Sequence, residues 1–403
     1  MNLATVSFSY LRARPLSTLL NIVLLALGIA TITVLLLVTR QLEERMMRDA
    51  QGIDLVIGAK GSPLQIILSS IYHLDVPTGN IPYLAAEELR KHRAVKQVIP
   101  LALGDSYRGF RIVGSTPAYA ALYRAAPASG AMFGKPLEAV LGSDVAAATG
   151  LAVGATFSGS HGLADGGSEH ESHAYRVVGI LARTGSVIDR VVLTSVESVW
   201  AVHGEHHGIT DIEHIAQAMP DEDKEYTALL VQYASPLAAA ILPRYVNANS
   251  QMQSASPAYE TARLFSVIGI GVEVLRAFAL VLVLAAGLSV FIGLYNALEE
   301  RRYDLAVMRT LGAGRLRIMT MMLFEGLLLA VTGAVIGILL GHVFTEVLGH
   351  ALGASRRGTM SGGVFLPEEL WLFGFACATG VVAALLPAWR ACRTDIAGTL
   401  ARG

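Results

Sequence analysis

Four apolar segments in the sequence are each long enough to cross a membrane as a helix, and they limit the folds open to this chain. They are residues 15–39, 277–298, 318–341 and 370–389, and only the third contains a charged residue, Glu325. A helix needs about 20 apolar residues to cross the hydrocarbon core of a bilayer. Charged residues make up only 16% of the chain, whereas soluble domains contain about a quarter. We therefore predict four transmembrane helices.

The spacing of these segments predicts a membrane protein of four transmembrane α-helices, with a mixed α/β extracytoplasmic domain inserted between helices 1 and 2. The first segment is too long for a signal peptide and lacks a small-residue cleavage site, so we interpret it as a retained anchor. The predicted parts are an N-terminal amphipathic segment (1–15), transmembrane helix 1 (16–39), the outer domain (40–272), transmembrane helix 2 (273–298), a loop (299–317), transmembrane helix 3 (318–348), a short outer loop (349–369), transmembrane helix 4 (370–389) and a tail (390–403).

Arginine placement predicts the orientation, because short cytoplasmic loops are enriched in Lys and Arg. The short outer loop contains only Arg356 and Arg357. Both termini and the 299–317 loop are therefore predicted to be cytoplasmic. Ten arginines lie on that side: Arg12, Arg14, Arg301, Arg302, Arg309, Arg315, Arg317, Arg390, Arg393 and Arg402.

The outer domain has the pattern of a folded α/β unit. Residues 175–181, 191–194 and 226–233 are rich in β-branched and aromatic residues and predict strands, as does the alternation around Phe110 and Ile112. Residues 81–92, 195–202 and 235–247 predict helices, and residues 64–72 carry an apolar helical stripe that favours core packing over a membrane-surface or substrate-facing role. Residues 151–176 are rich in Gly, Ser and His and predict a loop. No cysteine occurs between residues 40 and 350, so we expect no disulfide there.

Two features of the third segment stand out. Gly333, Gly337 and Gly341 recur every four residues, a spacing that lets another helix approach closely. Glu325 is the intramembrane charge, with two interpretations. It either contacts a substrate or coupling element, or it reaches Arg317 or lipid headgroups from a position near the cytoplasmic end. The spans show no polar rows typical of a solute tunnel.

Histidines in the outer domain offer candidate metal ligands. His170 and His173, and His203 and His206 with the neighbouring His207, have spacings that suit Zn²⁺, Cu²⁺ or Ni²⁺. The alternative is a solvated loop that binds no ion.

The sequence contains no H-E-x-x-H or G-x-S-x-G motif, so we expect no catalytic residues. The net charge of −1 gives no reason to expect nucleic acid as a partner.

The 299–317 loop contains a short amphipathic pattern. Leu305, Met308 and Leu311 lie near one face of a predicted helix that Gly312 and Gly314 stop. Such a helix can insert its apolar face into a groove on a partner. An ordinary basic loop that obeys the orientation rule would explain the arginines but not this stripe.

Three stretches resemble the MacB/FtsX family of ABC transporter permeases (type VII, LolC/LolE-like topology). Residues 299–314 read EERRYDLAVMRTLGAG, close to the family's E-R-x-x-E-x-A-x-x-R-x-L-G-A element, with Asp304 where the family usually has Glu. Residues 141–146 and 177–181 resemble its periplasmic core domain, and residues 386–393 its C-terminal end. The resemblance implies that the loop couples to an ATPase through Glu300, Arg301, Arg302, Asp304, Leu305, Met308, Arg309, Leu311 and Gly312.

The same resemblance implies a homodimeric permease in the bacterial inner membrane that transmits the motion of a separate ABC ATPase to a periplasmic domain. ATP and Mg²⁺ would bind that partner, since residues 52–60 fail the spacing of a phosphate-binding loop. The work would be export or extraction of a lipoprotein, lipid, peptide or periplasmic substrate, with membrane lipid, an adaptor, a lipoprotein carrier or a hydrolase as further partners. One alternative is a signalling component that activates a cell-wall hydrolase and transports nothing. Another is metal-linked transport through the histidines.

Overall fold

A computed structural model of the chain describes residues 8–9, 12–161, 174–203, 218–354 and 360–393. The chain forms two compact units. One comprises residues 1–42 and 268–403, and we call it the membrane unit; the other comprises residues 43–267, and we call it the outer unit. Helices α2 (Pro15–Asp49) and α10 (Pro257–Glu300) each run without a break from one unit into the other.

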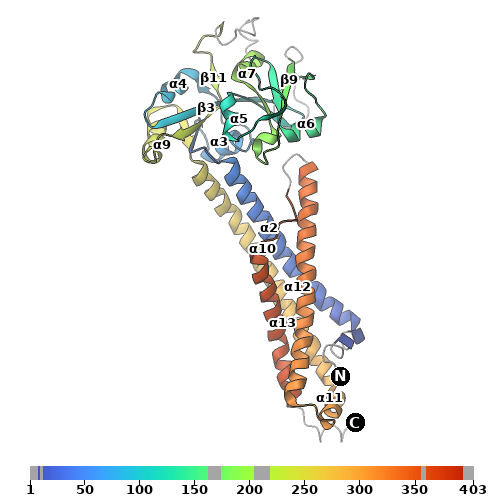
Figure 1. The fold of residues 1–403 in the computed structure, drawn as a ribbon. Helices are drawn as coiled ribbons and strands as arrows, with labels where there is room; N and C mark the ends of the chain where they lie inside the picture. The colour runs from blue at the N-terminus through green and yellow to red at the C-terminus, as the bar shows by residue number, and fades with distance from the viewer. Residues whose placement is uncertain (1–7, 10–11, 162–173, 204–217, 355–359, 394–403) are drawn as a thin grey trace. The chain divides into compact units, whose positions relative to one another are not determined.

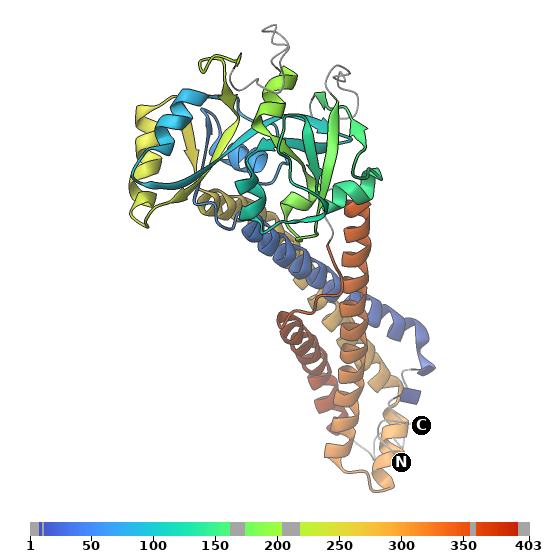
Figure 2. The same cartoon turned by 45° about the horizontal axis from the view of Figure 1, so that its top comes forward.

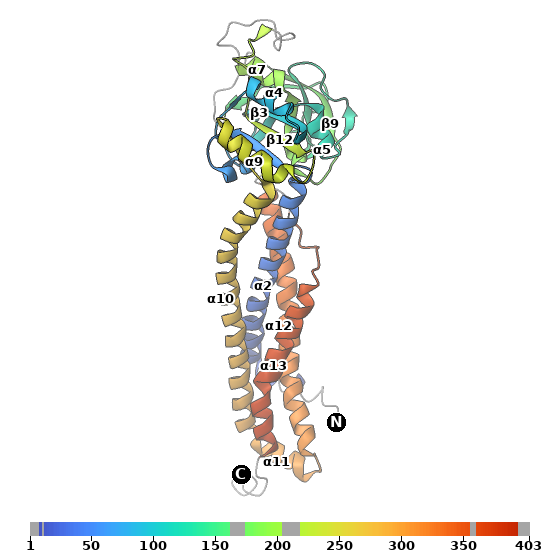
Figure 3. The same ribbon diagram turned by 90° about the vertical axis from the view of Figure 1, so that its left-hand side faces the viewer.

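The membrane unit is built from long apolar helices that lie side by side (Figures 1 and 3). Among the described residues, four helices are long and apolar enough to cross a membrane: α2, α10, α12 (Arg315–Ala354) and α13 (Glu368–Cys392). A short helix, α11 (Arg302–Thr310), joins α10 to α12. Large apolar side chains such as Phe278, Val281 and Leu284 are exposed on α10, as expected for a surface that faces lipid.

The interior of this bundle is packed with small and aliphatic side chains. One buried cluster joins all four long helices through Ile29, Val283, Ala334 and Ala376. Alanines and glycines at these positions let the helix backbones approach closely, which is how helices associate where lipid removes most of the hydrophobic driving force.

The outer unit is a mixed β-sheet covered by short helices (Figure 2). Among the described residues, eleven strands form one sheet with the order β13-β1-β12-β3-β4-β10-β6-β9-β5, and β7 and β8 pair with β9 and β3. Of the strand pairs in the described ranges, β4–β10 and β6–β9 are parallel and the others antiparallel. The strands are β1 (Leu55–Ala59), β3 (Val95–Tyr107), β4 (Phe110–Ser115), β5 (Pro127–Gly130), β6 (Glu138–Leu141), β7 (Thr156–Phe157), β8 (Ser160–His161), β9 (Tyr175–Leu181), β10 (Val192–Ser195), β12 (Ala228–Tyr233) and β13 (Met252–Ala255). A separate pair joins β2 (Ile81–Pro82) to β11 (Glu225–Tyr226).

Two apolar cores lie on this sheet. One centres on Trp200, Leu229 and Leu242, and the other on Phe110, Val177 and Val192. The helices that the structure describes in the outer unit are α3 (Pro63–Ser70), α4 (Tyr83–Arg90), α5 (Pro117–Leu122), α6 (Ser143–Thr149), α7 (Val196–His203) and α9 (Ala238–Asn249), with a 3₁₀ turn η1 (Val187–Arg190). The predicted fold class, four membrane helices with an α/β domain between the first and the second, is confirmed.

Several predicted elements differ in their limits. The helix expected over 235–247 begins at Ala238 and contains Pro243, because the residues from Ser235 form an irregular turn before it. The stripe in 64–72 belongs to α3 and the turn after it, where Ile67 and Ile71 are fully buried, so core packing is its role. The residues predicted as a loop over 151–176 include β7, β8 and the start of β9.

Candidate functional site

Helix α11 and the turns on either side of it form a hairpin between α10 and α12. Arg301 precedes the helix, and its carbonyl accepts the first helical hydrogen bond from the Leu305 amide at 3.0 Å. The helix ends at Thr310, and Gly312 follows with a φ of +99°, a left-handed conformation that glycine adopts without steric cost. The Ala313 amide then donates to the Met308 carbonyl at 3.0 Å. Of the two glycines predicted to stop the helix, Gly312 does so as the left-handed residue directly after the C-cap residue Leu311.

The inner face of α11 packs against its own bundle. Leu305 is only 1% exposed and lies in a cluster with Leu298, Ile318, Met322, Ala388 and Ala391, with Met308 packed at its edge. The prediction that Leu305 inserts into a groove on a partner is therefore corrected, because this side chain is already buried within the chain. Leu305 anchors the hairpin.

The face of α11 that points away from the bundle is exposed and therefore accessible to a partner. Leu311 is 82% exposed and Tyr303 is 53% exposed, which is unusual for large apolar side chains on a polar hairpin. Asp304 and Arg302 are exposed beside them, and Arg302 pairs with Glu299. Leu316, in the first turn of α12, is a further exposed leucine of the hairpin. We call Tyr303, Asp304, Leu311 and Leu316 the hairpin face.

A buried ion pair fixes the start of α11 to α12. The Arg301 Nη1 donates to Glu325 Oε1 at 3.0 Å and to Oε2 at 3.4 Å, and Glu325 is only 1% exposed. The partner of Glu325 is thus Arg301 of the hairpin. The sequence left two interpretations of Glu325 open, contact with a substrate or coupling element and an approach to Arg317 or lipid headgroups, and Arg317 is not the partner. Arg301 is one of the residues predicted to couple the loop to an ATPase. It is buried and its guanidinium is bound to Glu325, so it positions the hairpin, and its part in coupling stays a prediction. A second pair, Arg14 with Glu300, links the start of α2 to the end of α10.

The three spaced glycines of α12 lie against α2. A Cβ on Gly337 would come within 2.7 Å of Ile29 Cβ and 2.8 Å of the Ala26 carbonyl oxygen, and one on Gly341 would meet Thr33 Cβ at 2.6 Å. Gly333 has the same relation to Leu25.

A second close contact was missed at the sequence level. Gly326 of α12 faces Gly380 of α13, and a Cβ on Gly326 would lie 2.7 Å from the Gly380 carbonyl oxygen. The spacings Gly326-x₃-Ala330 and Gly380-x₃-Ala384 are small-residue pairs of the same type and were available as a signal.

A polar cluster at the other end of α12 was also missed. His342 Nδ1 lies 2.6 Å from the Gly362 carbonyl oxygen, and Nε2 lies 3.0 Å from Glu369 Oε2. Glu346 accepts from the Gly362 amide at 2.6 Å, and Gln41 of α2 exchanges two hydrogen bonds with the backbone of Ser361. These contacts tie residues 361–369 to α12 and α2. The signal available in the sequence was a histidine within an apolar segment.

The histidines give no metal centre in the described part of the chain. His170, His173, His206 and His207 lie outside the described residues. His203, at the end of α7, has its Nε2 at 3.7 Å from Asp105 Oδ1. No group of three or more His, Cys, Asp or Glu side chains among the described residues is placed to hold an ion. Metal binding stays a prediction.

Comparison with protein-family models matches both parts of the chain. The FtsX-like permease C-terminal model matches residues 276–396, which hold α11, α12 and α13. The MacB-like periplasmic core domain model matches residues 18–241, more than half of the chain. The chain belongs to the MacB/FtsX family of ABC transporter permeases. The hairpin is therefore the part of an ABC permease that lies between its second and third membrane helices.

Individual relatives of the permease are distant. The lipoprotein-releasing system transmembrane protein LolC of Haemophilus influenzae is 21% identical over 220 residues, covering 52% of this chain and 53% of LolC. The permease thus spans about half the length of the curated relative it matches. The periplasmic region of MacB from Actinobacillus actinomycetemcomitans is 11% identical with a TM-score of 0.34, over 54% of this chain and 97% of that structure. The extracellular domain of the transporter YknZ from Gram-positive bacteria is 14% identical with a TM-score of 0.31, over 51% and 99%.

Proposed function

We propose that this permease receives the motion of a separate ABC ATPase at the hairpin face and transmits it through its helices to the outer unit. The observation that carries the proposal is the two-sided construction of α11. Leu305 and the Arg301–Glu325 pair fasten one side of the helix to the bundle, while Tyr303 and Leu311 leave large apolar surface on the other. A helix built in this way is suited to docking in a groove of a partner and to passing on its displacement.

The packing of α12 supports the next step. Glu325 joins the hairpin to α12, and α12 in turn contacts α2 at Gly337 and Gly341 and α13 at Gly326. Close backbone packing of this kind leaves little free volume between the helices, so displacement of one helix is expected to move its neighbours with it as a rigid body. Helices α2 and α10 then continue into the outer unit.

The orientation and assembly belong to the same proposal. The arginine distribution favours a cytoplasmic hairpin and cytoplasmic termini in the inner membrane. ATP and Mg²⁺ would be held by the ATPase and not by this chain. Two copies of the permease with two ATPase chains would form the working unit. The name of the LolC relative makes lipoprotein release the first cargo to test, ahead of lipids, peptides and other periplasmic substrates.

The test is co-purification of the full chain in detergent with a candidate ABC ATPase, followed by measurement of ATP hydrolysis. Leu311→Asp places a charge on the most exposed apolar residue of the hairpin face. It is expected to lower both ATPase recovery and permease-dependent hydrolysis about tenfold, because a side chain that becomes buried on docking contributes about 1.4 kcal/mol or more to binding. Tyr303→Ala is expected to act in the same direction.

The matched control is Leu237→Asp, the same substitution at an exposed leucine of the outer unit. It is expected to leave both readouts unchanged. Leu305→Asp is unsuitable as a docking test, because it would place a carboxylate in the buried cluster and disturb the hairpin itself. Full ATPase recovery and hydrolysis with both Leu311→Asp and Tyr303→Ala would refute docking at the hairpin face.

A further inference from the structure

The outer unit contains a pocket that the proposed coupling does not use. Its volume is about 450 Å³, within the range of about 300–1,000 Å³ that is typical of small-ligand sites. The pocket is formed by the end of α2 and the turn after it, by β3 and β12 of the sheet, by α5 and the turn that follows, and by the turn before η1.

The lining is rich in hydrogen-bond donors and carries positive charge. Two guanidinium groups, Arg48 and Arg124, lie at the pocket with the carboxamides of Gln51, Gln97 and Gln232. No Asp or Glu is among the described residues that line it. Ile99 and Leu122 supply an apolar wall. A lining with two positive charges and no carboxylate favours an anion.

Arg124 is placed at the pocket without a partner of its own. Its guanidinium makes no hydrogen bond or ion pair with any residue that the structure describes. The backbone of Arg124 is left-handed, with a φ of +53°, a conformation that costs a non-glycine residue about 1 kcal/mol. The preceding residue is fixed, since the Tyr123 hydroxyl donates to the Asp49 carbonyl at 3.0 Å.

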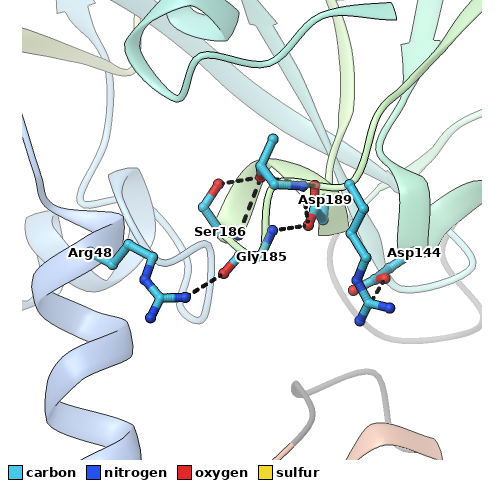
Figure 4. Close-up of polar contacts among 7 residues, drawn as sticks. Arg48, Asp144, Gly185, Ser186 and Asp189 are labelled. Carbon is cyan, nitrogen blue, oxygen red and sulfur yellow. Dashed lines mark hydrogen bonds and ion pairs between the residues drawn. The ribbon is translucent and has the colours of Figure 1, made fainter. Parts of the chain in front are cut away.

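The side of the pocket formed by Arg48 and the turn before η1 is ordered by hydrogen bonds within the chain. Figure 4 shows Arg48 pointing at the turn that contains Gly185 and Ser186, and its Nη1 donates to the Gly185 carbonyl at 3.5 Å. The Asp189 carboxylate organises that turn by accepting from the amides of Thr184 and Gly185 at 3.0 and 2.7 Å. One long hydrogen bond to a neutral carbonyl leaves most of the five N–H donors of Arg48 available.

We propose that this pocket binds a phosphate ester, with the phosphate between Arg48 and Arg124 and the organic part against Ile99 and Leu122. Guanidinium groups match the geometry of phosphate oxygens and form charge-assisted hydrogen bonds with them. Two guanidiniums and several carboxamides offer more donors than the two oxygens of a carboxylate accept. The volume and the apolar wall accommodate more than a bare ion. The source of the phosphate is either an anionic lipid headgroup or a free phosphate compound.

The test is calorimetric titration of the purified full chain, without any ATPase, with glycerol phosphate, inorganic phosphate, short-chain phosphatidylglycerol and acetate. We expect saturable binding of phosphate-bearing probes. Arg124→Gln and Arg48→Gln are each expected to weaken it about tenfold or more, as loss of a hydrogen bond to a charged group does. Arg93→Gln, an exposed arginine of the same unit outside the pocket, is the matched control with the same change in charge and is expected to bind as the wild type does. Thermal melting of each variant checks that it is folded.

The probes separate the sources. Binding of phosphatidylglycerol alone assigns a lipid headgroup, whereas binding of glycerol phosphate or inorganic phosphate assigns a free phosphate compound. Acetate binding with equal affinity would overturn the phosphate class. Failure of all phosphate probes to bind, or an equal loss in Arg93→Gln, would overturn the site. Because no ATPase is present, these results are independent of docking at the hairpin face.

Discussion

At the scale of single residues, the outer unit holds a histidine in its neutral form. His73 is buried, its Nδ1 lies 3.1 Å from the Ser69 carbonyl and its Nε2 lies 2.9 Å from the Tyr119 hydroxyl. A carbonyl only accepts, so Nδ1 carries the proton and Tyr119 donates to Nε2. Burial, together with the positive charge of Arg111, lowers the pKa of His73 from 6.5 to about 3.

This histidine predicts acid sensitivity. The folded-state pKa lies below the unfolded value, so the folded chain binds fewer protons and loses stability as the pH falls from about 6.5 towards 3. Between pH 7 and pH 5 the expected loss is about 2 kcal/mol in the free energy of unfolding. His73→Gln removes the titrating group and is expected to flatten this part of the profile, measured as the thermal midpoint of the full chain against pH. Identical profiles for the two proteins would contradict the assignment.

The Arg301–Glu325 pair gives a second residue-scale prediction. Removing one partner of a buried ion pair leaves an uncompensated charge and typically costs about 3–5 kcal/mol. Glu325→Leu is therefore expected to lower the thermal midpoint strongly, and Arg301→Met combined with Glu325→Leu is expected to recover most of the loss. If the double variant is no more stable than Glu325→Leu alone, loss of the Arg301–Glu325 pair does not account for the lower thermal midpoint.

At the scale of elements, the contact between α12 and α2 depends on the absence of side chains. Gly337→Ala places a methyl group 2.7 Å from Ile29 Cβ, and overpacking of this kind costs about 1–3 kcal/mol. Gly374→Ala in α13 is the matched control, since no atom lies within 4 Å of its Cβ. We expect a lower thermal midpoint for the first variant and an unchanged one for the second. Equal midpoints for the two would argue against tight α2–α12 packing.

Element existence was largely predictable, whereas the direction of side chains was not. Strand β9 was predicted with the limits it has, because residues 175–181 are rich in β-branched and aromatic side chains, which favour a strand. The α11 stripe was visible in the sequence, but periodicity cannot tell whether an apolar face meets a partner or the chain's own bundle, and Leu305 meets the bundle. The Arg301–Glu325 and His342–Glu369 pairs join residues 24 and 27 positions apart through tertiary packing, which no local pattern encodes. The pocket at Arg124 assembles five elements and left no trace in the sequence.

At the scale of the whole molecule, α10 is the longest single connection between the two units. Its 44 residues run from Pro257 to Glu300 and give a helix about 66 Å long at 1.5 Å per residue. Glycines weaken a helix, yet α10 continues through both Gly269 and Gly271, and no atom would lie within 4 Å of a Cβ on either.

This continuity predicts a matched pair of variants. Gly269→Ala favours the helix and is expected to preserve transmission, whereas Gly269→Pro removes a helical hydrogen bond and breaks or kinks the helix at a cost of about 3 kcal/mol. The measurement is hydrogen exchange across residues 43–267 with the ATPase bound, before and after addition of ATP. We expect the ATP-dependent change to vanish in Gly269→Pro while ATPase binding persists. An undiminished change would mean that α10 does not carry the motion.

The His342 cluster has a consequence for how α13 is held at its beginning. One ring nitrogen of His342 lies at the Gly362 carbonyl oxygen and the other at the Glu369 carboxylate, so a single side chain of α12 contacts both ends of the stretch from Gly362 to Glu369. Glu346, one turn further along α12, accepts from the Gly362 amide. A rotation of α12 about its own axis would therefore draw the first turn of α13 with it.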